Sequence, residues 1–154
     1  MTAPVFVDTN VLVCLHTDSD PAKQERADKW IDFLVRRRAG RLSTQVLQEL
    51  YAVLTRKVRP PLELELARSI VRDLGSWKPL SLEPAVLERA WNLESRYSLS
   101  WWDSLIVAAA QASRCGVLLT EDLQDGQQFG SVRVVDPFSV EARDPRDVLE
   151  SRGR

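Results

Sequence analysis

Residues 5–10 read VFVDTN, three apolar residues followed at once by three polar ones. The apolar residues are β-branched or aromatic, which is typical of a strand buried on both faces. Asp, Thr and Asn often start helices and turns, so the strand is predicted to end at Val7 with a short helix after it. This prediction places Asp8 at the carboxyl end of a buried strand.

Two more apolar runs, at residues 117–119 and 132–135, predict further buried strands. Most of the sequence between has the 3.6-residue period of amphipathic helices. These helices are expected to begin near Pro21, Thr44, Leu62, Pro84 and Trp101. Strands separated by helices predict a mostly parallel sheet with helices on both faces. The expected fold class is α/β, as a single α/β/α sandwich.

Some finer details are also expected around these helices. Gly40 should end the helix that begins at Pro21, and Leu42 should begin a brief strand. Residues 79–82 predict a weak strand. The residues expected to face inward on the helix from Pro84 are Val86, Leu87, Ala90 and Trp91.

The composition is that of an ordinary globular protein, with 154 residues, 44% of them hydrophobic. A net charge of −1 excludes a strongly basic nucleic-acid binder, although a local basic groove remains possible. No apolar run approaches the ~18 residues of a membrane span, and no signal peptide is recognisable. We expect a cytoplasmic protein with no membrane partner. Its predicted parts are a domain over residues 1–138 and a charged tail over residues 139–154.

Cysteine and histidine usage narrows the chemistry. Cys14 and Cys115 lie far apart in a chain that can build its own core, which favours reduced thiols over a disulfide or a metal site. His16 is the single histidine of the sequence. A His-rich zinc site is therefore excluded, and a Ser-His-Asp triad is disfavoured.

Acidic residues follow two of the predicted strands. Asp8 comes directly after the first strand, and Asp122 comes three residues after Leu119. Ligands of open α/β sheets bind beyond the carboxyl ends of the strands. If these strands are parallel neighbours, both acids emerge at the same edge of the sheet.

Two predicted helices offer further acids, each with a purely structural alternative. Asp103 interrupts an apolar helix and should lie near the core, but Ser100 and Asp103 also have the spacing of a capping box. Glu49 lies on the border of the apolar stripe of its helix, where an ordinary boundary glutamate is an equal alternative.

Carboxylates gathered at one place need a counter-charge. Two unit charges ~4 Å apart repel by about 4 kcal/mol at an effective dielectric constant of about 20. The cluster must therefore take up protons or bind a cation. Oxygen ligands without a nearby histidine favour Mg²⁺ or Mn²⁺, metals that typically activate water against a phosphodiester.

The chain resembles the PIN domain, and more narrowly the VapC-type ribonuclease toxins of bacterial toxin–antitoxin pairs. The resemblance covers about residues 4–138. It rests on residues 5–10, on Glu49, on Trp102-Asp103 within an apolar helix, and on LLTED at residues 118–122.

The resemblance implies a metal-dependent endoribonuclease that hydrolyses RNA with Mg²⁺ or Mn²⁺. Asp8 and Asp103 match the family's principal metal ligands, and Glu49 and Asp122 complete a four-acid catalytic site. The cognate antitoxin is expected to lay a segment across this acidic pocket.

Other polar residues near the four acids have smaller roles. The resemblance implies that Asn10 orients Asp8. It also matches Thr120 to the family's hydroxyl residue beside Asp122. Asp125 has no firm family counterpart, and we interpret it as a loop acid.

Surface features leave several alternatives open. Basic clusters at residues 36–41 and 56–59 stand at the ends of predicted helices. There they either stabilise the negative end of the helix dipole or contact RNA phosphates. Trp101 and Trp102 are expected in the core or in a dimer seam, with stacking on RNA bases as the alternative. The resemblance implies a homodimer, for which residues 61–74 with Trp91 and Tyr97 are the candidate surface.

Two other functions compete with the nuclease. A phosphatase of the haloacid dehalogenase type also has an Asp after its first strand, but it needs a second Asp where this chain has Asn10. A non-catalytic RNA- or protein-binding module on the same fold is the other alternative.

Overall fold

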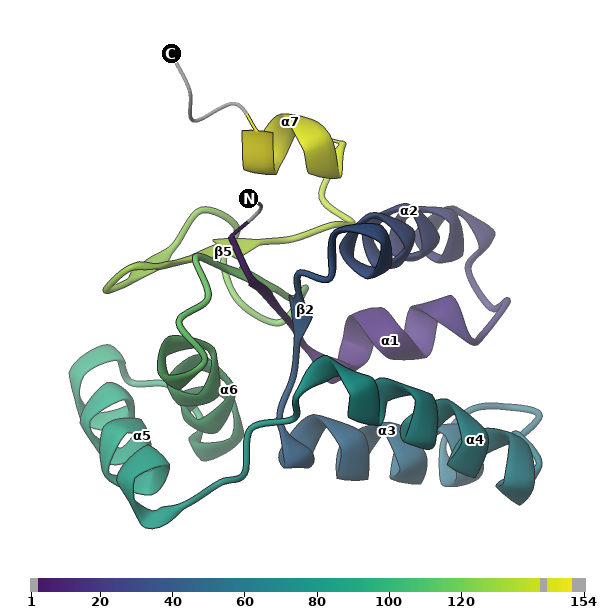
Figure 1. The fold of residues 1–154 in the computed structure, drawn as a ribbon, viewed down its shortest axis with the longest axis horizontal. Helices are drawn as coiled ribbons and strands as arrows, with labels where there is room; N and C mark the ends of the chain where they lie inside the picture. The colour runs from purple at the N-terminus through teal and green to yellow at the C-terminus, as the bar shows by residue number, and fades with distance from the viewer. Residues whose placement is uncertain (1–2, 142–143, 151–154) are drawn as a thin grey trace.

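A computed structural model describes residues 3–141 and 144–150 of the chain, and Figure 1 shows its helices and strands. In chain order the elements are β1 (Val5–Val7), α1 (Thr9–Leu15), α2 (Pro21–Arg37), β2 (Gly40–Arg41), α3 (Thr44–Arg56), α4 (Leu64–Leu74), η1 (Gly75–Trp77), α5 (Pro84–Tyr97), α6 (Trp101–Ala112), β3 (Val117–Leu119), β4 (Gln128–Phe129), β5 (Val132–Val135) and α7 (Pro145–Glu150).

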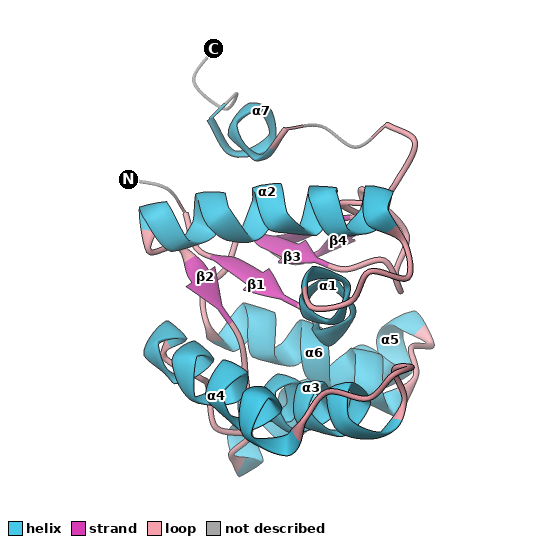
Figure 2. Ribbon diagram, turned by 90° about the vertical axis from the view of Figure 1, so that its right-hand side faces the viewer, coloured by secondary structure: helices cyan, strands magenta, loops and turns pink. Residues whose placement is uncertain are grey.

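The five strands form one sheet in the order β2-β1-β3-β5-β4. All neighbours are parallel except β4 and β5, which are antiparallel. Figure 2 shows α2 on one face of the sheet and α3 to α6 on the other. This arrangement confirms the predicted α/β sandwich with a mostly parallel sheet.

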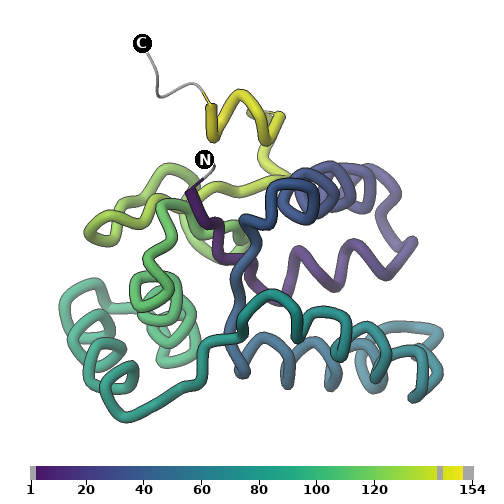
Figure 3. Tube along the Cα trace, viewed as in Figure 1, coloured from purple at the N-terminus to yellow at the C-terminus, as the bar shows by residue number. Residues whose placement is uncertain are grey.

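The two strands that carry the predicted acids lie side by side. Val5 pairs with Val117 and Val7 with Leu119, so β1 and β3 end level with each other. Figure 3 shows these two segments, which are far apart in the sequence, crossing the centre of the molecule together. All three residues of each strand are buried, because helices cover both faces of the sheet.

Side-chain caps set the starts of four helices, as their sequences predict. Asp8 caps α1, Asp20 caps α2, and Ser43 caps α3. Ser100 caps α6, where its hydroxyl oxygen accepts a hydrogen bond from the Asp103 backbone N–H at 3.1 Å. Each cap satisfies a backbone donor that the first turn of a helix leaves without an internal partner.

Gly40 does not end α2, contrary to expectation. Arg38 ends it instead, in the left-handed conformation with φ of 52°, and Gly40 opens strand β2, ahead of the expected Leu42. A Cβ on Gly40 would collide with the Trp77 ring, so glycine allows the close packing there.

Two other local expectations are wrong. Residues 79–82 form no strand, because only Leu80 pairs, through a single bridge to Ser43. Trp91 does not face inward: it is 48% exposed and stacks on Trp101, with 6.3 Å between ring centroids. The helix period sets which residues share a face, but the tilt of α5 on α6 decides where the core ends.

The structure also contains elements that the sequence pattern did not predict. β4 is only two residues long and adds an antiparallel edge to the sheet. Within the predicted tail, α7 packs on α2 with Pro145 and Val148 buried, and Glu150 pairs with Arg37 at 2.8 Å. No helix within the described residues is both long enough and apolar enough to cross a membrane.

Candidate active site at the carboxyl edge of the sheet

Asp8 is the most buried acid of the candidate site, with 5% of its surface exposed. Its Oδ1 accepts a hydrogen bond from the Thr9 backbone N–H at 2.7 Å, which is the cap of α1. Its Oδ2 accepts hydrogen bonds from the Thr120 hydroxyl at 2.8 Å and from the Asn10 amide at 3.3 Å. Both oxygens of this carboxyl group are therefore held in place.

Burial raises the pKa of Asp8 from its ordinary value of 3.8 to about 7. The hydrogen bonds from Thr120 and Thr9 lower this pKa, and the nearby charges of Asp122 and Glu49 raise it. Near neutral pH the carboxyl group is thus poised between its protonated and ionised forms. A cation placed beside it would favour the ionised form.

Asn10 and Thr120 join Asp8 to Asp122. The Asn10 amide nitrogen lies 3.1 Å from the Thr120 hydroxyl and 3.0 Å from Asp122 Oδ2, and both oxygens accept from it. The Thr120 hydroxyl donates its single hydrogen to Asp8 and also accepts from the Asp122 backbone N–H at 3.1 Å. This closed network confirms that Asp8 and Asp122 share one edge of the sheet.

Glu49 reaches the same site from the middle of α3. Thr9 donates its hydroxyl hydrogen to Glu49 Oε2 at 3.0 Å, and Gln45 donates an amide hydrogen to Oε1, also at 3.0 Å. Both carboxylate oxygens of Glu49 therefore have a donor. Sequence patterns do not single out Thr9 or Gln45 as positioning residues, although Gln45 stands one helical turn before Glu49.

Asp103 lies in the first turn of α6, where the predicted cap to Ser100 is present. Burial raises the pKa of Asp103, the hydrogen bond with Ser100 lowers it, and the charges of Asp122 and Glu49 raise it further. Ser100 therefore caps the helix through the Asp103 backbone, while the Asp103 carboxyl group lies within electrostatic range of Asp122 and Glu49. The cap and a role for the Asp103 side chain in the site are compatible.

The four acids provide oxygen donors only, the ligand set that Mg²⁺ and Mn²⁺ prefer. Among the residues that the structure describes, no three acidic, histidine or cysteine side chains already form a metal cluster. Mg²⁺ is usually held by one or two carboxylates and keeps several waters, so the donor set fits such an ion.

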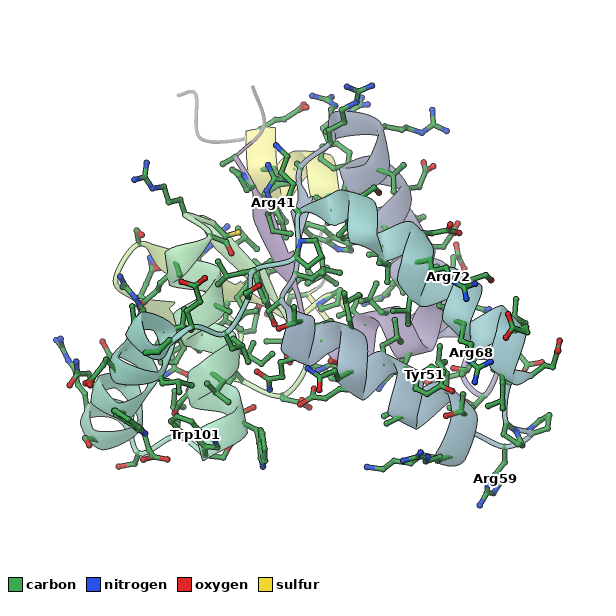
Figure 4. All side chains as sticks on the ribbon, turned by 60° about the horizontal axis from the view of Figure 1, so that its bottom comes forward. Arg41, Tyr51, Arg59, Arg68, Arg72 and Trp101 are labelled. Carbon is green, nitrogen blue, oxygen red and sulfur yellow. The ribbon has the colours of Figure 1, made fainter. Side chains whose placement is uncertain are left out.

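A groove of about 790 Å³ between α1, α3 and α6 is lined by two of the four acids, Glu49 and Asp122, but not by Asp8 or Asp103. Its lining includes Asn10, Glu49, Val53, Trp102, Asp122 and, directly after α3, Lys57. Figure 4 shows Arg59, Arg68 and Arg72 on the α3–α4 side of the molecule and Trp101 on the opposite, α5–α6 side. Of these basic residues, Lys57 lines the groove together with Glu49 and Asp122.

Two other acids near the site have structural partners. Glu121 pairs with Lys23 at 2.7 Å. Asp125 Oδ1 accepts a hydrogen bond from the Asp136 backbone N–H at 2.9 Å, which ties down the loop after β3. This contact agrees with the interpretation of Asp125 as a loop acid.

Comparisons with known proteins agree with this geometry. The sequence profile of the PIN domain matches residues 5–125. A toxin–antitoxin complex from Klebsiella pneumoniae is similar in structure, with a TM-score of 0.64 and 19% identity over 88% of this chain and 99% of that chain. A search of curated proteins gave no significant match.

Two further solved structures are similar. VapC20 of Mycobacterium tuberculosis, a toxin that cleaves the sarcin-ricin loop, has a TM-score of 0.60 and 22% identity, covering 84% of this chain and 98% of that chain. VapBC2 from Rickettsia felis, bound to a DNA fragment from its promoter, has a TM-score of 0.60 and 15% identity, covering 84% and 96%. At these identities the likeness shows a shared fold.

Proposed function

The chain belongs to the PIN domain family, and we propose that it is a metal-dependent endoribonuclease, the toxin of a type II toxin–antitoxin pair. One observation carries the proposal: a buried aspartate at the end of β1 shares a hydrogen-bond network with Asp122. Burial and the neighbouring acids raise the pKa of this residue, Asp8, to about 7. Burying these carboxylates together costs stability when they are ionised, and a bound cation would offset that cost.

The metal ligands in this proposal are Asp8, Asp103, Glu49 and Asp122. A bound Mg²⁺ or Mn²⁺ supplies charge that lowers the pKa of water and stabilises the developing negative charge on a phosphate. Thr120 and the Thr9 backbone N–H hold the two oxygens of Asp8, so this ligand is oriented in advance.

Glu49 and Asp122 are the candidate proton acceptors. Asp122 is solvent-exposed, and Glu49 lines the groove with both oxygens already in hydrogen bonds. A water molecule attacking the phosphorus can pass its proton to either carboxylate. Water is the nucleophile in this mechanism, because the site has no histidine pair to activate the ribose 2′ hydroxyl.

Analysis of RNA ends tests the mechanism. Cleavage should need Mg²⁺ or Mn²⁺, stop in excess chelator, and leave 5′ phosphate and 3′ hydroxyl ends. A 2′,3′-cyclic phosphate, or cleavage that persists without a divalent cation, would refute it. Chelation should leave the fold intact, because the apolar core does not depend on a metal.

We also propose a homodimer and a cytoplasmic antitoxin partner. The homodimer proposal is supported by Leu64 and Leu66 on α4, which are each 50% exposed, and by Trp91. Tyr97 contributes less surface, because it packs edge-on against Phe129 with 4.9 Å between ring centroids. A monomer in light scattering at micromolar concentration would refute the dimer.

A further inference from the structure

Two adjacent tryptophans at the start of α6 have different surroundings. Trp101 is half-buried and stacks on Trp91, with ring planes 24° apart. Trp102 is 62% exposed and lines the groove together with Glu49 and Asp122. A large aromatic side chain left in water beside the acids offers a surface for a ligand.

The position of Trp102 indicates which part of a ligand would meet it. Under the proposed function, a phosphodiester lies at the four acids and carries a nucleoside on either side. Trp102 lines the groove together with Glu49 and Asp122, so its ring borders the place where one of these nucleosides must lie. Stacking on a flat indole suits any base, provided that the base is not already stacked within a duplex.

A cation stands farther along the same groove. Glu49 and Lys57 both line it, and eight residues at the rise of an α-helix place them about 12 Å apart along α3. Between these two residues, α3 contributes Ala52 and Val53 to the groove lining, and neither carries a charge. Lys57 is exposed and can contact a phosphate that lies away from the acids.

We propose that this groove holds one single strand of RNA, with the base next to the cleaved phosphate stacked on Trp102 and a neighbouring backbone phosphate on Lys57. The inference rests on the proposed function and adds to it two residues that hold the substrate, Trp102 and Lys57. Trp102 is a positioning residue in this scheme.

Binding of a short fluorescent single-stranded RNA to the full-length Asp8→Asn protein, in Mg²⁺, tests both contacts without cleavage. Trp102→Ala should weaken binding roughly 5- to 150-fold, the range for loss of one stacked base. The salt dependence should not change, because no phosphate contact is lost. Val35→Ala, which removes a 54% exposed apolar side chain on α2, outside the groove and outside the proposed dimer surface, is the control and should leave affinity unchanged.

Lys57→Gln should change the salt dependence of binding, which Trp102→Ala leaves unchanged. Loss of one phosphate contact on a single strand lowers the slope of log affinity against log salt by about 0.7. Lys29→Gln is the matched control, because Lys29 is exposed on α2, on the opposite face of the sheet. A duplex of the same sequence should bind more weakly than the single strand to the protein with Trp102 intact.

An abasic oligonucleotide of the same length separates stacking from a change in groove shape. Trp102→Ala should not weaken binding of this probe, and an equal loss would overturn the inference. Unchanged affinity for the normal RNA would also overturn it and would leave the groove to a protein partner. These failures differ from failure of the proposed function, in which the wild-type protein would cleave no RNA.

Discussion

The two strand-edge acids, Asp8 and Asp122, are held differently from the two helix acids, Glu49 and Asp103. The strand-edge acids are connected to each other through Asn10 and Thr120. Glu49 is held by Gln45 of its own helix and by Thr9 of α1, and the Asp103 carboxyl group is coupled by charge to Asp122 and Glu49. The strand edge is therefore preformed, whereas α3 and α6 complete the site by packing beside it.

Replacement of Asp8 should have the largest effect. Asp8→Asn keeps the shape of the side chain but removes a charged ligand, so RNA cleavage should fall by at least about 100-fold. The far-UV spectrum should stay unchanged. Asp125→Asn makes the same chemical change on an exposed loop acid and should leave the rate unchanged; a comparable loss there would contradict the assignment of the site.

Thr120→Val should be the next most damaging change, because it cuts the link between the strand-edge acids. The variant leaves Asp8 without its hydroxyl donor and Asn10 without one acceptor. We expect a loss of cleavage of about 10- to 100-fold, the usual effect of removing a partner of a metal ligand. Thr120→Ser restores the hydroxyl and should recover most of the rate; if it does not, the hydrogen bond is not the cause.

Thr9→Val tests the helix side and should cost less. Glu49 loses the donor to Oε2 but keeps Gln45 on Oε1, so one oxygen stays oriented. Cleavage should fall by no more than about tenfold. A loss as large as that of Thr120→Val, measured under the same conditions, would show that the helix acids are as strictly organised as the strand edge.

The remaining effect should be on stability rather than on the cleavage rate, through the titration of Asp8. Its pKa is about 7 in the folded protein against an ordinary 3.8, so between these values the folded protein binds a proton that the unfolded chain releases. Raising the pH through this window therefore destabilises the wild type. In chelator, the stability of Asp8→Asn relative to wild type should rise from about pH 4 to about pH 7 and then level off.

Denaturant unfolding of both proteins across this range measures the difference directly. Carboxyl groups distant from Asp8 titrate alike in both proteins, so their contributions cancel in the comparison. A difference that does not change with pH would contradict the raised pKa of Asp8. Saturating Mg²⁺ should reduce the dependence, because a bound cation favours the ionised carboxylate.

The sequence by itself determined β1, β3, β5 and the helix starts. Three-residue apolar runs and capping residues act locally, so β1, β3 and the start of α6 follow from short segments. It also placed Asp8 and Asp122 after the ends of two strands. These acids meet because β1 and β3 are parallel neighbours that end level with each other, a pairing that the tertiary structure supplies.

Only the tertiary structure decided which side chains position the acids and which aromatic rings remain exposed to solvent. Thr9 meets Glu49 across 40 residues of sequence, a contact that no local pattern encodes. Trp91 and Trp102 both stand on helices with apolar stripes, yet the packing of α5 on α6 leaves both exposed. Periodicity says which residues share a face of a helix; the neighbouring helices determine how much of that face is covered.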